Sequence, residues 1–360
     1  MARDKHWYDT LYTYIWLFNT GRGLSVCIRL PHNVGIIYDL GSDDDFSPVK
    51  FMLKNIIPHL NKYKNFPIAQ CILSHPHTDH ISEIDFIIAK KLNPCLLTCP
   101  NDKENQDEDQ KVDFERIIRD DNRDIINKYR EAYKKRELPL QTIQRLSSGT
   151  APNLEYGIYY LRPGYVASIH DNDSQKYCNG LSIVLYLRHG NQSILIPGDI
   201  TPEVFKKVIN GNFGVERRYT YFRNEPDDTP SDFHERTSSQ PILRDLLQER
   251  GLSVLIAPHH GLESGFCKEL FEVIKDNKPQ INVISEKRHL SDSDGEVSQN
   301  YQSPNYSKGI NVNIEGENES RYSVSTRNGH HILMIFEGTN SRPRIYLRKD
   351  PKELLNITKK

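Results

Sequence analysis

The sequence lacks any long hydrophobic run. Its most apolar stretch near the N-terminus, Tyr14-Ile15-Trp16-Leu17-Phe18, is soon interrupted by Asn, Arg and Gly, well short of the about 20 apolar residues that a membrane-spanning helix needs. No small-residue cleavage site follows it, which argues against a secretory signal peptide. We therefore expect a cytoplasmic protein that does not interact with a membrane.

The sequence also lacks a charge excess and a cysteine framework. The 47 Lys and Arg nearly balance the 48 Asp and Glu, so a nucleic acid would have to contact a local basic patch. The six cysteines include no CxxC pair, which favours reduced thiols over disulfide bonds. No Walker-type phosphate loop and no nucleophile elbow is present to supply a catalytic centre.

The length of 360 residues and an even mix of helix-like and strand-like segments predict one large α/β domain over residues 1–350. Apolar runs between Gly- and Pro-rich breaks predict strands at residues 12–18, 24–30, 35–40, 69–74, 154–161, 182–187, 193–196, 253–257, 281–285, 322–326, 331–336 and 345–347. Helical periodicity predicts helices at residues 48–63, 82–91, 240–249 and 271–275, and a further one that starts at Thr201-Pro202. The turn Arg327-Asn328-Gly329 predicts a closing hairpin between the strands on either side of it.

Two segments depart from this alternation. Residues 101–145 are densely charged with apolar residues at roughly helical intervals, which predicts an inserted helical pair, interpreted as a surface hairpin without a catalytic role. Residues 288–319 are polar and poor in apolar side chains, which predicts a long loop.

The most informative motif is His75-Pro76-His77-Thr78-Asp79-His80, directly after the buried strand at residues 69–74. Zinc binds neutral imidazole and carboxylate groups, and a catalytic zinc site keeps one position open for water or substrate. The alternative interpretation is a polar turn with incidental histidines. The motif therefore predicts a metal site at the end of a strand.

Two further strand ends carry metal-binding groups. Asp199 follows Pro197-Gly198 after one strand, and His259 and His260 follow Pro258 after another. Strand ends at one edge of an α/β sheet converge on one crevice. We therefore expect these distant segments to complete a single site.

The motifs in this order resemble the metallo-β-lactamase fold, and within it most closely the hydrolase domain at the C-terminal end of the competence proteins called ComEC. The resemblance is carried by the segments 19–23, 36–41, 75–80, 179–185, 196–199, 257–261 and 326–329. It implies a four-layer αβ/βα sandwich with the metals in the cleft between two β-sheets.

The resemblance also implies a role for each site residue. His75 and His77 would hold a first metal, Asp79 and His80 a second, and Asp199 would bridge them. His260 is the preferred last ligand, with His259 as an alternative or a residue behind the ligands. Asp39 would accept a hydrogen bond from a ligating imidazole, and Asn179 would support the ligands without touching metal. The implied cofactor is one or two Zn²⁺ ions, with Mn²⁺ as an alternative, and Asp79 and Asp199 would serve catalysis.

The sequence departs from the resemblance at three places. Many members of the fold place a third histidine where this chain has Cys178 and Asn179, which leaves a mononuclear site open. His170, Asp171 and Asp173 are alternative ligands there, although a plain polar loop is the preferred interpretation. Ser82-Glu83 replaces a usual Gly pair, and Leu262 replaces a usual Ser.

A hydroxide held by the metals would be the nucleophile of the predicted hydrolase. The first hypothesis is a phosphodiesterase or nuclease, in which Arg217, Arg218 and Arg223, interleaved with Tyr219, Tyr221 and Phe222, contact nucleic acid. The second is an amide, ester or peptide hydrolase that acts as the effector of a multi-protein antiviral defence system of bacteria, with protein partners docked on its insertions. The third is a degenerate, non-catalytic module without the third histidine.

Overall fold

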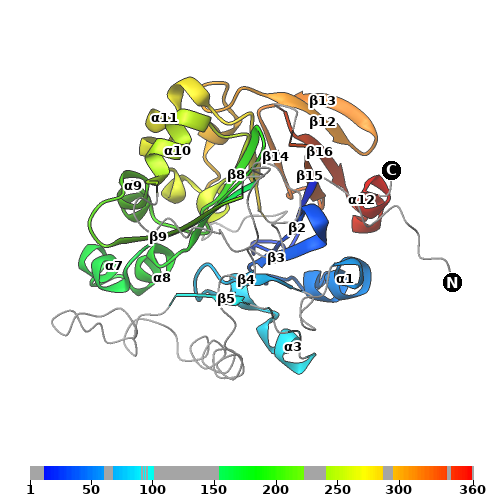
Figure 1. Cartoon of the computed structure of the whole chain (residues 1–360), viewed down its shortest axis with the longest axis horizontal. Helices are drawn as coiled ribbons and strands as arrows, with labels where there is room; N and C mark the ends of the chain where they lie inside the picture. The colour runs from blue at the N-terminus through cyan, green and yellow to red at the C-terminus, as the bar shows by residue number, and fades with distance from the viewer. Residues whose placement is uncertain are drawn as a thin grey trace, which may run out of the picture.

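The computed structural model describes residues 12–60, 68–90, 92, 94, 96–100, 154–222, 241–286, 295–338 and 342–358. The charged insertion predicted at residues 101–145 lies outside them. Within them two β-sheets lie at the centre, with helices on the outer side of each sheet (Figure 1).

The first sheet has nine strands and combines both ends of the chain. Its strands, in spatial order, are β13 (Glu317–Arg321), β12 (Ile310–Ile314), β16 (Arg344–Arg348), β15 (His331–Phe336), β1 (Thr13–Leu17), β2 (Val26–Leu30), β3 (Val34–Tyr38), β4 (Gln70–Ile72) and β5 (Leu96–Thr98). The antiparallel pairing of β1 with β15 brings the N-terminal strands, blue in Figure 1, beside the red C-terminal strands. The strands β3, β4 and β5 run parallel, so their carboxyl ends lie at one edge.

The second sheet has seven strands. In spatial order they are β14 (Ser323–Ser325), β11 (Ile281–Ile284), β10 (Val254–Ile256), β8 (Gln192–Ile196), β7 (Val184–His189), β6 (Leu154–Leu161) and β9 (Val215–Phe222). The strands β8, β10, β11 and β14 run parallel and form a second shared edge of carboxyl ends.

The helices are short. They are α1 (Pro48–Asn55), α2 (Thr78–Ile81), α3 (Ile84–Ala89), α7 (Pro163–Ile169), α8 (Ser174–Gly180), α9 (Pro202–Asn210), α10 (Leu243–Arg250), α11 (Lys268–Val273) and α12 (Pro351–Ile357). Helix α9 shows why the sequence folds this way locally. Pro202 occupies its first turn, where the missing N–H costs nothing, and Gly211 ends it in the left-handed conformation. No helix in the described ranges is long and apolar enough to span a bilayer.

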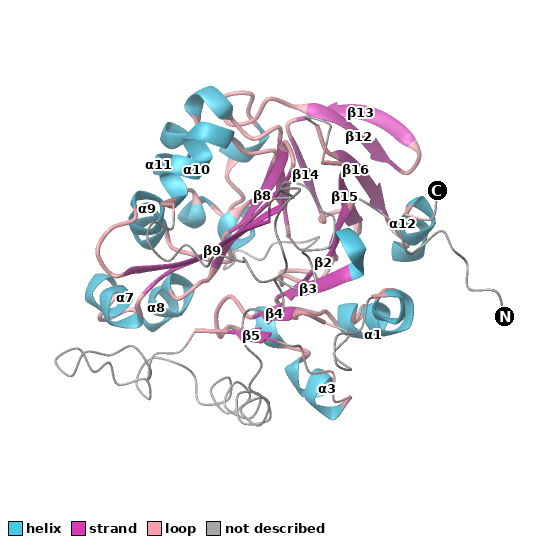
Figure 2. Cartoon of the chain, in the orientation of Figure 1, coloured by secondary structure: helices cyan, strands magenta, loops and turns pink. Residues whose placement is uncertain are grey.

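Three apolar layers hold these elements together. Ile15 and Leu17 of β1 belong to the layer between the two sheets, whereas Tyr14 and Trp16 of the same strand belong to the layer under α1, α3 and α12. A third layer lies between the second sheet and α9, α10 and α11, which cover its outer side (Figure 2). Successive side chains of a strand point to opposite faces of its sheet, and in β1 both sets are buried. The sheets are therefore covered on both sides. The predicted four-layer αβ/βα sandwich is confirmed.

Two local predictions are wrong. The strands on either side of residues 327–329 do not form a hairpin, because β14 pairs with β11 in one sheet and β15 pairs with β1 in the other. The stretch predicted as a polar loop at residues 288–319 contains β12 and most of β13 in its described part, which form an antiparallel hairpin at the edge of the first sheet. Only alternate residues there, Ile310 and Val312, are buried, so the strand pair is mostly polar and resembles a loop in composition.

The cysteines within the described residues, Cys27, Cys71, Cys99, Cys178 and Cys267, are free thiols. This agrees with the absence of a disulfide framework in the sequence.

Candidate metal centre

Three strand ends bring the predicted ligands together. Strand β4 ends at Ile72 and leads into His75, after which His77 occupies the N-cap position of α2 and the helix presents Asp79 and His80. Asp199 follows β8 after Gly198, which has a left-handed φ of 62°. His260 follows β10 in the short 3-10 helix Pro258–Gly261 and is itself left-handed, with φ 55°.

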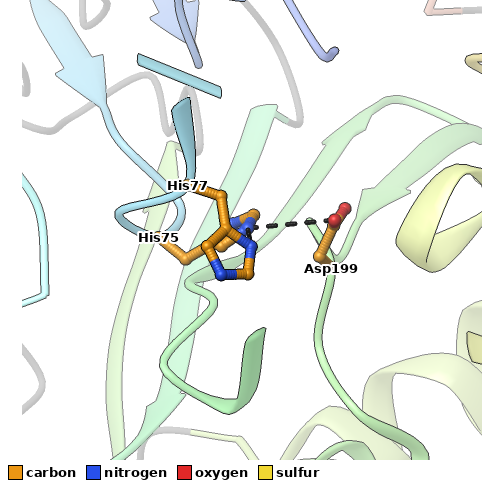
Figure 3. A group of neighbouring side chains, drawn as sticks. All are labelled: His75, His77 and Asp199. Carbon is orange, nitrogen blue, oxygen red and sulfur yellow. Dashed lines mark hydrogen bonds and ion pairs between the residues drawn. The ribbon is translucent and has the colours of Figure 1, made fainter. Parts of the chain in front are cut away.

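The ligand atoms form two adjacent groups. We call His75, His77 and Asp199 half-site 1, shown in Figure 3, and Asp79, His80 and His260 half-site 2. The donor atoms within each group all lie within 4.8 Å of one another. In half-site 1, Nε2 of His75 lies 3.1 Å from Nδ1 of His77.

Asp199 lies between the two half-sites. Its Oδ2 is 3.8 Å from Nε2 of His75 and 3.3 Å from Nε2 of His260, and its Oδ1 is 3.3 Å from Nε2 of His80. Its backbone N–H donates to Oγ of Ser182 at 3.1 Å, which holds the turn in place. The carboxylate is therefore placed to contact cations in both half-sites.

Asp39 lies behind the histidines and is fully buried. Its Oδ2 accepts from Nδ1 of His80 at 2.7 Å and from the hydroxyl of Ser74 at 2.7 Å, and its Oδ1 accepts from the backbone N–H of Ser74 at 2.6 Å. Such hydrogen bonds set the tautomer and orientation of a ligating imidazole. The carboxylate thus contacts His80 directly and approaches His75 through Ser74.

Buried carboxylates dominate the electrostatics of the cluster. Burial alone would lower the pKa of His80, but the charges of Asp199 and Asp39 outweigh it and raise that pKa well above its usual value. The pKa of His260 rises to about 9, because Asp199 outweighs the opposing effect of burial. Burial, helped by the neighbouring His80, instead keeps the pKa of His75 well below its usual value. The cluster therefore favours positive charge beside its carboxylates.

Other residues predicted for the site lie outside both half-sites. His259 is half-buried, its Nδ1 lies 3.3 Å from Oγ of Ser264, and its ring centroid is 6.2 Å from that of His260. Asn179 is buried in α8, and its Oδ1 has no hydrogen-bond partner among the described residues. His170 donates to or accepts from Oγ1 of Thr201 at 2.8 Å and does not replace a ligand.

Two glycines allow the loops of the first sheet to pack against α2. A Cβ added to Gly23 or to Gly41 would lie 2.2 Å from the carbonyl oxygen of Asp79. The same carbonyl accepts the backbone N–H of Leu24 at 3.3 Å. Only glycine admits such a close approach of backbone, so these positions fix where Asp79 lies.

Sequence reasoning gave no role to Ser74, Ser182 or Ser285, although each hydrogen-bonds a ligand or its backbone. Ser182 lies within the segment 179–185 that carries the resemblance, and the only signal for the other two is proximity to the motifs. Glu83, noted only as a departure, accepts from the backbone N–H of Val49 at 2.8 Å and from the hydroxyl of Ser47, and so secures the start of α1.

Comparisons with known proteins give little beyond the fold. The sequence profile of no known family matches the chain, and no curated protein matches it significantly. Similar solved structures include the metallo-beta-lactamase fold protein YhfI from Bacillus subtilis, with 14% identity, 76% of this chain and 98% of that chain covered, and a TM-score of 0.30. Another is unliganded yeast PDE1, with 13% identity, 78% of this chain and 89% of that chain covered, and a TM-score of 0.32. These similarities are too weak to assign a family, so the function is argued from the geometry of the site.

Proposed function

We propose that this chain is a metal-dependent hydrolase of the metallo-β-lactamase type and that its substrate is a phosphodiester. The observation that carries the proposal is the pair of adjacent half-sites that can share Asp199. The donor atoms, their number and the net charge of the site all support it.

The donor atoms of half-site 2 fit a cation. Nδ1 of His80 faces Asp39, and Nδ1 of His260 lies 3.2 Å from the carbonyl oxygen of Ser285. In a neutral ring each Nδ1 therefore carries the proton, which leaves a lone pair on Nε2. The two Nε2 atoms lie 3.4 Å apart beside the carboxylates of Asp79 and Asp199, whose charges raise the pKa of both rings. A metal ion would take the place of the protons that these carboxylates favour on the two Nε2 atoms.

The number of donors fits a catalytic site. Half-site 1 offers three protein ligands when Asp199 is counted, and half-site 2 offers four when the same carboxylate is shared. Three protein ligands and one open position are the usual pattern of catalytic zinc. The absence of a third histidine therefore leaves room for water or substrate. The mixture of imidazole and carboxylate donors favours Zn²⁺, with Mn²⁺ as the alternative.

The net charge fits an anionic substrate. Asp39, Asp79 and Asp199 together carry a charge of −3, and two divalent ions carry +4, so the loaded site has a net charge of +1 when its histidines are neutral. Arg22 adds a further positive charge nearby. Burial is the main cause that lowers the pKa of His259, and the charge of Arg22 lowers it further. A phosphodiester, with one negative charge, matches this field better than a neutral amide.

Divalent ions held in the half-sites would lower the pKa of a coordinated water and stabilise charge on the attacked group. The protein's own part is to hold the donors. Asp199 would help to keep the two ions at a fixed separation, because its Oδ2 lies near both His75 of half-site 1 and His260 of half-site 2, while its Oδ1 faces His80 of half-site 2. Asp39 would keep the ring of His80 in the ligating tautomer. His259 would lie outside the ligand set, because it belongs to neither half-site.

A substrate panel tests the proposal. Wild-type protein is incubated with Zn²⁺ or Mn²⁺ and bis-p-nitrophenyl phosphate, single-stranded DNA, RNA or casein. We expect hydrolysis of the phosphodiesters and none of casein. Asp199→Asn should abolish it, whereas Asp245→Asn, which makes the same change on the exposed face of α10, should leave it intact.

The same panel separates the remaining hypotheses. Cleavage of casein with intact nucleic acid would support the peptide hydrolase and contradict the phosphodiesterase. No turnover of any substrate by a protein that binds metal would contradict both. For a nuclease, binding of the nucleic acid should also weaken steeply with salt. The basic segment predicted to contact nucleic acid is only partly described: Arg217 of β9 pairs with Tyr159 of β6, and Tyr159 is buried in the layer under the helices.

A further inference from the structure

We propose that the hydroxyl of Ser74 is a positioning group for His75 and that it controls metal occupancy of half-site 1 selectively. This inference rests on the proposed metal-binding function. Ser74 directly precedes His75 in the sequence, and its hydroxyl contacts both His75 and His80.

The backbone of Ser74 is held independently of its side chain. Its N–H donates to Asp39 at 2.6 Å, and its carbonyl oxygen accepts the N–H of Ile183 from the other sheet at 3.1 Å. The residue is fully buried. Removal of the hydroxyl alone should therefore leave the path of the chain unchanged.

The hydroxyl has one hydrogen and four polar neighbours, one of which is the hydroxyl of Tyr38, itself a donor to the carbonyl oxygen of Ile183 at 2.7 Å. Its Oγ lies 2.7 Å from Oδ2 of Asp39, 3.0 Å from Nδ1 of His75 and 3.4 Å from Nδ1 of His80. An ionised carboxylate only accepts hydrogen bonds, so the hydroxyl donates to Asp39. It is then an acceptor for the N–H at Nδ1 of His75.

This hydrogen bond decides which nitrogen of His75 can ligate. With the proton on Nδ1, the lone pair is on Nε2, the atom that faces His77 and Asp199. Without an acceptor at Nδ1, the ring can place its proton on Nε2 instead, and this tautomer cannot bind a metal through Nε2, the nitrogen that faces half-site 1. Ser74 therefore keeps His75 competent as a ligand.

The histidines of half-site 2 have other supports. His80 has the shorter contact of 2.7 Å with Asp39, and His260 has the carbonyl oxygen of Ser285. Loss of the Ser74 hydroxyl removes neither. Loss of the Asp39 carboxylate, by contrast, affects His80 directly and His75 through Ser74. The two substitutions should thus have different patterns of effect.

Zinc titration of the full-length, chelator-stripped protein tests this. Affinities are measured by competition with a chromophoric chelator, and bound zinc is counted after gel filtration. Ser74→Ala should weaken one of the two zinc sites about 10–100-fold and leave the other unchanged. Asp39→Asn should weaken both. Ser25→Ala is the matched control, because Ser25 is also fully buried and its hydroxyl has no hydrogen-bond partner among the described residues.

Three outcomes would overturn the inference. If Ser74→Ala binds two zinc ions with wild-type affinities, the hydroxyl has no such role. If Ser74→Ala weakens both sites equally, the role of the hydroxyl is structural and not selective. Thermal unfolding of the zinc-free variant should then show a loss of stability as well. If wild-type protein binds no zinc, the proposed function itself fails, which the other two outcomes do not imply.

Discussion

The close approach of Gly23 to Asp79 provides a sharp prediction about the site. In Gly23→Ala the new Cβ would lie 2.2 Å from the carbonyl oxygen of Asp79, whereas ordinary contacts begin at 3.4 Å. Both groups are attached to backbone, so one segment must move by about 1 Å. A misplacement of about 1 Å in a catalytic site can cost about 100-fold in rate. We expect kcat/KM for the phosphodiester to fall by about this factor, and the free energy of unfolding to fall by about 1–3 kcal/mol.

Gly35→Ala separates the effect on the site from the effect on stability. Its new Cβ would meet Cδ1 of Leu60 at 2.4 Å, the end of a side chain that can rotate, and it lies on β3 away from the ligands. We expect this variant to keep wild-type zinc affinity and kcat/KM per folded molecule. Both quantities are measured with bis-p-nitrophenyl phosphate and by zinc competition. Gly23→Ala with zinc affinity and activity within about threefold of wild type would refute the reasoning.

Three further predictions follow from the same structure. Gly41→Ala displaces the same carbonyl as Gly23→Ala, so the kinetic cost of the double variant should be smaller than the product of the single costs; a fully multiplicative effect would contradict this. Zinc at about 100 times its Kd should stabilise the fold by about 2.7 kcal/mol, so a chelator should lower the Tm, and an unchanged Tm would argue against a site in the folded protein. Burial lowers the pKa of His189 to about 4, below the unfolded value of about 6.5. Its contribution to stability is therefore complete above pH 6.5 and is lost as the pH falls toward 4, with a slope of about 1.4 kcal/mol per pH unit. Urea unfolding at pH 7 and pH 5 should show a smaller loss for His189→Gln than for wild type, and equal losses would contradict the assigned pKa.

Much of the site's framework was predictable because each ligand segment has a local signal. The strand before His75 is a short apolar run, Pro197 and Gly198 precede Asp199, and His260 lies between Pro258 and Gly261, so each strand end is marked by composition. The parallel course of β8 and β10 then brings two of these ends to one edge. Convergence of the groups therefore follows from strand ends and sheet topology together.

Partner choice could not be predicted from local signals. The strands β14 and β15 each have strand-like composition, but their separation into different sheets depends on contacts with β11 and β1, which come from distant parts of the chain. The same holds for the serine contacts. The hydroxyl of Ser182 supports Asp199 from 17 residues away, and the carbonyl oxygen of Ser285 faces His260 from 25 residues away. Such hydrogen bonds exist only once the tertiary structure is formed.

The most direct test of the central claim is a crystal structure of the zinc-loaded protein with anomalous data at the zinc edge. We predict two anomalous peaks, one in contact with His75, His77 and Asp199 and the other in contact with Asp79, His80, His260 and Asp199. No peak at these residues in a protein that is saturated with zinc would contradict the account.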